Sequence, residues 1–355
     1  MMAASEESCS LTFLDTSAQN LKESNDVNEV YRDVSKWTQV DLNKLGIHYS
    51  EYDISLRRLE ELAKKSSCTQ QNSSGITRVP ACLSTLENFL TDHFKLCIPH
   101  DNLKRHLPRQ NVVEYLQYIS ENRQKLWEDL SMFEKQTNMG DEEKRLLNVL
   151  HLKVQDYLTS LGRFMVARGD GPVPDITYTQ LVMDFLRIFF LFPQLGKSKI
   201  TQMKIGKQEV VSAPDLRFEE YPGPQLITLL RMSNEVSTSC EEHEDDSIPN
   251  YFSIQSLPAH ILGQHGADLL LDIDNCVFYP GILGIICLRT KLIFTYLELT
   301  EDHINFIQKG TLMGAKGASI QYTRPYDYWN PEDRKEIFST LFWLGHLQTA
   351  SEWHW

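Results

Sequence analysis

The chain of 355 residues is long enough for about two domains, and its hydrophobic content of 41% is sufficient for a sizeable core. A net charge of −13 works against non-specific binding to nucleic acid, and no apolar run is long enough for a transmembrane helix. The seven cysteines are an odd number and include no Cys-x-x-Cys pair, which argues against a disulfide framework and against a zinc finger or ribbon.

The N-terminal part of the chain, residues 1–79, is expected to be a flexible region with short helices and a linker. Its first residues are acidic where a signal peptide needs basic ones, so we expect an intracellular protein, cytoplasmic or nuclear. Few apolar residues occur before residue 29, which predicts disorder there. Residues 29–65 carry apolar side chains that suggest two or three short helices, and the small polar residues of 66–77 suggest a linker.

Residues 80–170 predict a helical region. Apolar side chains recur at helical spacing over 112–133 and again over 147–165. Between these two stretches Gly140 suits the end of one helix, and the acidic residues that follow it suit the start of the next. The pattern therefore predicts an αα-hairpin, whose apolar stripe is interpreted as intramolecular packing rather than as a surface for a partner.

Residues 171–355 predict a mixed α/β domain, whose boundary lies in the Gly- and Pro-rich stretch at 169–174. An apolar helix comes first, and three short strands in a row follow it. A further helix, a β-hairpin and a last helix that begins near Pro331 complete the domain. The fold class expected for the whole chain is α+β, with a central mixed sheet. The expected elements cover 177–192, 200–205, 210–218, 226–232, 258–271, 281–288 and 292–299.

This order of elements resembles the core of the PD-(D/E)XK restriction-endonuclease-like family over roughly residues 177–300. The resemblance rests on Pro214-Asp215 in the second strand and on the third strand, Ile227 to Arg231. It implies a restriction-endonuclease-like α/β domain. In this family two acidic residues hold Mg²⁺, because one carboxylate alone binds the ion too weakly, and a lysine activates the attacking water.

The chain departs from the family pattern at two positions of the third strand. Leu229 occupies the position of the second acidic residue, and Arg231, which stays charged and is a poor base, occupies that of the lysine. The resemblance still implies candidate catalytic residues, namely Asp215, Arg231 and Gln264. It likewise implies candidate metal ligands, namely Asp215, Glu219 and Glu235, with Glu220 and Asp184 as further acids.

Each candidate also has a purely structural interpretation. Asp215 follows a proline, which is typical of a turn or a strand end. Arg231 suits a salt bridge, and Gln264 suits a helix surface.

Three hypotheses about function follow. The first is a degenerate, non-cleaving nuclease-like domain that acts as a binding module without a cofactor. Its partner would be a protein bound by the helical region or a nucleic acid bound by the α/β domain. The alternative is a Mg²⁺-dependent nuclease that uses Asp215 with a relocated acid. The third is an α+β scaffold unrelated to nucleases.

Overall fold

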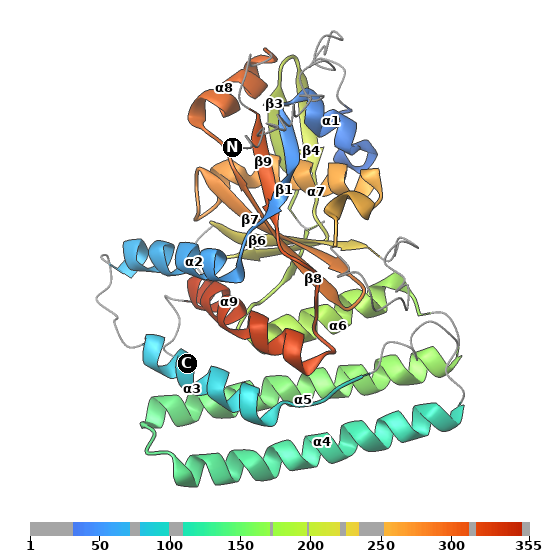
Figure 1. Cartoon of the computed structure of the whole chain (residues 1–355), viewed down its shortest axis with the longest axis vertical. Helices are drawn as coiled ribbons and strands as arrows, with labels where there is room; N and C mark the ends of the chain where they lie inside the picture. Colours follow the sequence, from blue (N-terminus) through green and yellow to red (C-terminus); the bar gives the residue numbers. More distant parts are fainter. Residues whose placement is uncertain are drawn as a thin grey trace, which may run out of the picture.

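A large mixed β-sheet occupies the middle of the structure, with helices on both faces and a helical region at one end (Figure 1). The mixed α+β class, the helices of the N-terminal half and the central mixed sheet are as the sequence predicts. The computed structural model describes residues 31–71, 79–98, 109–170, 173–196, 199–220, 225–233, 252–311 and 317–349.

The sheet is built around β6 and β7, which run parallel, and it gains a second parallel pair at its edge from β1 and β9. The pairs β9–β8, β8–β7, β6–β5 and β5–β2 are antiparallel, and β10 pairs with β8. In spatial order the strands are β1 (Ile47–Asp53), β9 (Ala318–Tyr322), β8 (Lys291–Glu298), β7 (Gly281–Leu288), β6 (Leu226–Ser233), β5 (Leu216–Glu219) and β2 (Gln194–Leu195), with β10 (Tyr326–Asp327) beside β8.

The hairpin of β7 and β8 is the best-predicted part of the sheet. Every residue of β7 is buried, as its continuous apolar sequence requires of a strand covered on both faces. Arg289, in the two-residue turn, has a positive φ of 55°, which is typical of tight β-hairpin turns. The predicted hairpin is therefore confirmed.

The three strands predicted in a row are in fact four, because the second is interrupted at Pro214. β3 (Thr201–Ile205) and β4 (Gln208–Ser212) form a separate two-stranded sheet. Pro214 cannot donate to a strand ladder, and the chain turns at Asp215 before it enters the main sheet as β5. The single strand predicted over 210–218 is thus wrong, and it is divided between two sheets.

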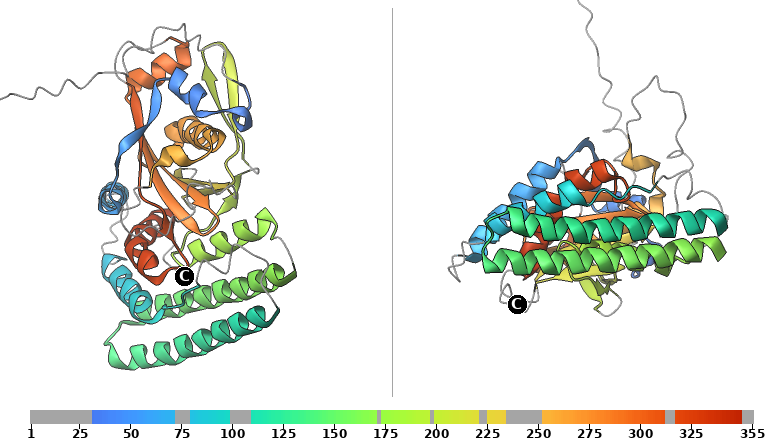
Figure 2. Two further views of the ribbon diagram at one scale, coloured as in Figure 1. Left: turned by 45° about the vertical axis from the view of Figure 1, so that its right-hand side comes forward. Right: turned by 90° about the horizontal axis from the view of Figure 1, so that it is seen from below.

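The helical region lies beyond one face of the sheet, where α4 and α5 run antiparallel along its outer side (Figure 2). The first of these helices ends at Gln136 and the second begins at Asp141, which confirms the predicted αα-hairpin. The apolar side chains along both helices are largely buried, which confirms that they pack within the molecule. In Figures 1 and 2, α6 and α9 lie between this region and the sheet. The helical region consists of α3 (Val79–His93), α4 (Arg109–Gln136) and α5 (Asp141–Asp170). The two helices between it and the sheet are α6 (Asp175–Arg187) and α9 (Pro331–Thr349).

The N-terminal part of the chain contributes to the sheet, which the sequence does not predict. Within 29–65 the structure has the helices α1 (Gln39–Lys44) and α2 (Leu56–Gln71), but β1 lies between them and pairs with β9. The short helices predicted for this stretch are therefore present, and the strand between them is an addition that the sequence pattern did not predict. The predicted linker begins as the last residues of α2, and residues 1–28 and 72–77 lie outside the described residues.

The opposite face of the sheet is covered by α7 (Ala259–Asp272), which lies over β6 and β7 and also contacts the β3–β4 hairpin. Nearby, α8 (Glu301–Lys309) contacts β3. The sequence pattern does not single out α8. Its signal is the Thr300 hydroxyl, which caps the helix by accepting a hydrogen bond from the His303 backbone N–H. Among the described residues, no helix is long and apolar enough to span a membrane.

Candidate functional site

A buried polar network lies where α7 faces the strands β3 to β6, and it includes three of the predicted site residues, Asp215, Glu219 and Arg231. On α7, His265, Asp268 and Asp272 are spaced three and four residues apart, which places them on one side of the helix. All three side chains are fully buried. Buried carboxylates need partners, and two arginines from neighbouring strands supply them.

Asp272 binds Arg217, which projects from β5. Arg217 Nη1 lies 2.6 Å from one carboxylate oxygen of Asp272 and Nη2 lies 2.7 Å from the other, so the pair is bidentate. The Thr201 hydroxyl of β3 donates to the same carboxylate over 2.9 Å. Glu219 accepts hydrogen bonds from Arg217 Nε and from Lys199, which extends this ion-pair cluster to the surface.

Asp268 binds Arg231, which projects from β6. Arg231 Nε donates to the Asp268 carboxylate over 2.9 Å, a second guanidinium N–H donates to the same oxygen, and the Ser212 hydroxyl of β4 binds the other oxygen. Burial raises the pKa of Asp268 to about 6, while the Arg231 charge acts in the opposite direction. The two carboxylates of α7 thus attach both strands of the β3–β4 hairpin to the core.

Asp215 lies in the turn between β4 and β5, next to Arg231. Its carboxylate accepts a hydrogen bond from the Met232 backbone N–H over 2.8 Å, and Arg231 Nη1 lies 3.7 Å away. One third of its side chain is exposed. The structure therefore brings Asp215, from the turn before β5, and Arg231 of β6 together at the solvent-facing edge of the network.

His265 occupies the inner end of the network. Its Nε2 lies 2.7 Å from the Thr295 hydroxyl of β8. Burial, together with the Arg231 charge, lowers the pKa of His265 to about 3, so the ring is neutral near pH 7. The face of β7 opposite it carries Gly284, where a Cβ would lie 2.7 Å from the imidazole Cε1. His265 is therefore confined by close packing.

The other predicted site residues contact different parts of the protein. Gln264 donates a hydrogen bond to the Ser35 backbone carbonyl over 2.7 Å, and so contacts the N-terminal segment rather than Asp215. Asp184 accepts hydrogen bonds from side chains of α5 and α6. The Glu220 carboxyl has a pKa raised by burial. Leu229 is buried in β6, opposite Arg217, and Glu235 lies outside the described residues.

The predicted metal ligands Asp215 and Glu219 face different cations. Asp215 lies beside Arg231, whereas Glu219 binds Arg217 and Lys199. Within the part of the chain that the structure describes, no group of three or more His, Cys, Asp or Glu side chains is placed to hold a metal ion. The assignment of Asp215, Glu219 and Glu235 to a metal site stays a prediction.

Sequence reasoning did not single out the residues that dominate this network, namely Arg217, Asp268 and Asp272. A signal was present for the two acids. Polar residues at 265, 268 and 272 interrupt an otherwise apolar helix at helical spacing, which indicates a polar stripe on one face. Arg217 carried no such signal, because one cation in a short strand equally suits an exposed position.

Comparisons with known proteins do not assign the chain to a family. No family model matches it, and the searches of curated proteins and of solved structures found no match. The fold and the network therefore define it as a mixed α+β protein with a buried carboxylate–arginine network between α7 and the sheet.

Proposed function

We propose that the chain is a non-cleaving binding module, whose α/β part has a degenerate restriction-endonuclease-like fold and whose helical region carries the partner surface. The single observation that supports the absence of cleavage is the pairing of the network carboxylates with arginines. Asp272 and Asp268 each accept at least two hydrogen bonds from one guanidinium.

The physical reason is competition for carboxylate oxygens. Mg²⁺ needs oxygen ligands at about 2.0–2.1 Å in near-octahedral geometry, usually from one or two carboxylates together with water or substrate. A metal ion at Asp268 or Asp272 would have to displace a buried guanidinium, which would leave an arginine charge without its partner at a cost of several kcal/mol. Asp215 keeps an exposed edge, but Arg231 lies beside it in place of a second acid.

The helical region offers the apolar surface that a binding module needs. On α4 and α5, large apolar side chains remain exposed to solvent although both helices are otherwise packed. Trp127 is 57% exposed and its indole ring packs on the His151 imidazole, with centroids 4.8 Å apart. Tryptophan is enriched among residues that dominate binding energy. The other exposed apolar residues are Val113, Met132, Leu152 and Val166.

The binding role is tested by replacing Trp127 with alanine in the full-length chain. Affinity purification of tagged protein from expressing cells, followed by quantitative mass spectrometry, compares wild type with Trp127→Ala. Ile200→Ala is the matched control, because Ile200 is 66% exposed but lies next to β3, on the other side of the sheet. We expect Trp127→Ala to lose most of a protein partner that the control retains. Equal recovery with both variants contradicts the proposed surface.

A further inference from the structure

Exposed and half-buried side chains recur every seven residues along one side of α4 and along one side of α5. Seven residues make almost two full turns, so each set forms a row along its helix. We call the two rows together the outer face, which consists of Val113, Ser120 and Trp127 on α4 and of Leu152, Thr159 and Val166 on α5. Its four apolar side chains are between 46% and 63% exposed, so the described part of the chain leaves them uncovered.

Contacts between the two antiparallel helices place the two rows level with each other. The Trp127 ring packs on His151, the residue before Leu152. Two to three turns further along, a Cβ at Gly162 would lie 3.5 Å from a methyl carbon of Leu116. The three levels of the outer face are Val113 with Val166, Ser120 with Thr159, and Trp127 with Leu152. The rows therefore form one continuous surface on the outside of the molecule, where α4 and α5 run side by side (Figure 2).

The helix α3 covers a different side of this hairpin. Phe89 of α3 packs edge-on against Phe133 of α4, with centroids 5.4 Å apart, and His93 Nδ1 lies 3.1 Å from the Asp129 carboxylate. By helical spacing, Phe133 and Asp129 lie on the side of α4 that is turned away from the row of Ser120. The hairpin is thus attached to the rest of the protein through one side, and the outer face is open.

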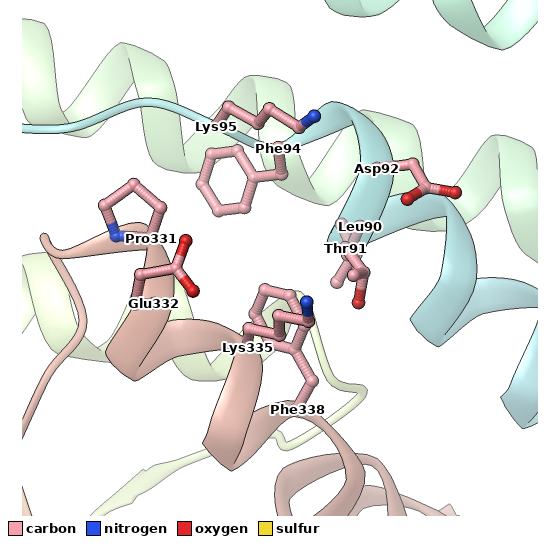
Figure 3. Close-up of a pocket in the computed structure, with 9 residues that line it drawn as sticks. All are labelled: Leu90, Thr91, Asp92, Phe94, Lys95, Pro331, Glu332, Lys335 and Phe338. Atoms are coloured by element: carbon pink, nitrogen blue, oxygen red, sulfur yellow. The ribbon is translucent and has the colours of Figure 1, made fainter.

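A pocket at the junction of α3 and α9 is separate from the outer face (Figure 3). It is lined by the rings of Phe94 and Phe338 and by charged side chains of both signs, such as Lys95 and Glu332, and none of its described lining residues belongs to α4 or α5. Its volume of about 370 Å³ suits a small molecule rather than a protein chain. A protein partner is therefore better accommodated on the outer face.

We propose that the outer face binds the outer face of a second copy of this chain, around a two-fold axis at the level of Ser120 and Thr159. The inference rests on the proposed function, whose partner surface includes Trp127, and it names the partner. In this dimer α4 packs antiparallel on α4 of the second copy, and α5 packs antiparallel on α5. Seven-residue spacing is typical of helices that pack in this way, and a two-fold axis requires a surface that is complementary to itself.

The sizes of the side chains along the outer face fulfil this requirement. The small side chains of Ser120 and Thr159 at its middle level let the two copies approach closely, and the Thr159 hydroxyl already donates to the Gln155 backbone carbonyl over 2.8 Å. When the face is reversed by the two-fold axis, the large Trp127 lies against the smaller Val113 of the second copy. The large and small ends of the face are therefore matched.

The charges beside the row on α5 are complementary in the same sense. Asp156 and Arg163 are both exposed, three residues before and four residues after Thr159, and neither forms an ion pair within the described residues. The two-fold axis brings each Asp156 to within about 1.5 Å, along the helix axis, of the level of Arg163 in the second copy. The equivalent positions on α4 carry the uncharged Gln117 and Gln124. Two reciprocal ion pairs at the rim thus fix the register of the dimer.

The area of the outer face is sufficient for a stable dimer. The 28 residues of α4 span about 42 Å, and two helices side by side are about 20 Å wide. Each copy therefore offers roughly 800 Å², which is about the area that each partner buries in a specific protein–protein interface.

Sedimentation equilibrium of the purified full-length protein tests the dimer. We expect wild type to be a dimer that dissociates in the micromolar range. Ser120→Glu places two carboxylates next to the two-fold axis and should weaken the dimer at least about tenfold, because like charges then face each other. Met132→Glu is the matched control, since Met132 is 50% exposed on α4 but lies a third of a turn away from the row of Ser120. It should leave the dissociation constant unchanged.

Exchange of the rim charges tests the register. Asp156→Arg and Arg163→Asp should each weaken the homodimer, because each variant places two pairs of like charges at the rim. A mixture of the two variants should form a heterodimer, in which both rim pairs again have opposite signs. The double variant Asp156→Arg/Arg163→Asp should recover the affinity of wild type.

Three results would overturn the proposal: a monomer at all concentrations, equal dissociation constants for Ser120→Glu and Met132→Glu, or no heterodimer in the mixture. The proposed function fails separately, because it is tested by the recovery of partners from cells. A monomeric protein that still captures another protein through Trp127 would contradict the second copy as partner and would support the partner surface.

Discussion

At the scale of single residues, the arginines of the α7 network change the chemistry of the acids beside them. An exposed carboxylate pair attracts a divalent cation, whereas Asp268 and Asp272 are fully buried and each is matched by a guanidinium. Buried ion pairs add little net stability over apolar packing, but removal of one partner is strongly destabilising because the other charge is then buried without a partner. The network is therefore better suited to fixing the position of the β3–β4 hairpin than to exchanging ligands.

His265 provides a prediction for the pH dependence of stability. Its pKa is about 3 in the folded protein and 6.5 in a model compound, so below pH 6.5 the unfolded chain takes up a proton that the folded state does not bind. Stability from this group is thus present above pH 6.5 and lost as the pH falls. Asp268 acts oppositely, because its pKa is raised from 3.8 to about 6 and the folded state holds the extra proton between these values.

Urea unfolding at several pH values between 6 and 4 isolates the histidine contribution. Replacement His265→Gln should reduce the loss of unfolding free energy on acidification by about 1.4 kcal/mol per pH unit, whatever its effect at pH 7. His260→Gln, in the exposed first turn of the same helix, is the matched control for the loss of one histidine from α7. If the unfolding free energy of His265→Gln falls with pH as steeply as that of wild type, His265 is protonated in the folded protein and the prediction is wrong.

At the scale of elements, α7 is positioned from both sides. Its carboxylates bind the strands, while Gly263 on its other side allows the start of α1 to approach closely. A Cβ at Gly263 would lie 2.3 Å from the Cα of Thr38, a contact that only a backbone shift could relieve. This glycine therefore serves close packing between α7 and α1, in spite of the low helix propensity of glycine.

Alanine substitution at glycine distinguishes the effect of close helix packing on stability from the effect of helix propensity. Gly263→Ala should lower the free energy of unfolding by about 1–3 kcal/mol, because overpacking outweighs the gain in helix propensity. Gly162→Ala on α5 is the matched control, since its Cβ would lie 3.5 Å from the nearest Leu116 carbon, which is ordinary contact. We expect this control to be neutral or slightly stabilising by chemical denaturation. Equal effects of both substitutions would contradict the close approach of α1.

Elements with strong local patterns could be predicted from the sequence, and elements defined by distant partners could not. The β7–β8 hairpin and the αα-hairpin carry continuous apolar or helical periodicity, so their types follow from local residues. β1 becomes a strand only by pairing with β9, which lies some 270 residues later in the chain. The separation of β4 from β5 at Pro214 likewise depends on where each strand finds its partner.

The candidate site was predictable in the same partial way. The sequence placed Asp215 and Arg231 on neighbouring segments, and the structure brings them within 3.7 Å. It could not show that Arg231 turns its guanidinium towards Asp268, because that contact joins a strand to a helix across the core. Nor could it show that Gln264 binds the N-terminal segment, since the position of that segment depends on the packing of α1 against α7.

At the scale of the whole molecule, the paired polar groups lie in the interior between α7 and the sheet, and unpaired apolar side chains lie on the surface of the helical region. The polar groups between α7 and the sheet are largely matched to one another, whereas the outer helices of the helical region keep exposed tryptophan, methionine and leucine side chains. Function as a binding module through that region, with no metal chemistry in the sheet, is the account that this division supports. The competing account, a Mg²⁺-dependent nuclease that uses Asp215, differs from it in one measurable property.

That property is metal binding coupled to cleavage. Mn²⁺ and Mg²⁺ are titrated by calorimetry into wild type and Asp215→Ala, with Asp274→Ala as a control for an exposed acid, and the same samples are incubated with labelled single- and double-stranded DNA and RNA. We predict no saturable binding that depends on Asp215 and no cleavage by any of the three proteins. Metal binding and cleavage by wild type and Asp274→Ala that both disappear in Asp215→Ala would contradict the account and assign the protein a rearranged nuclease site.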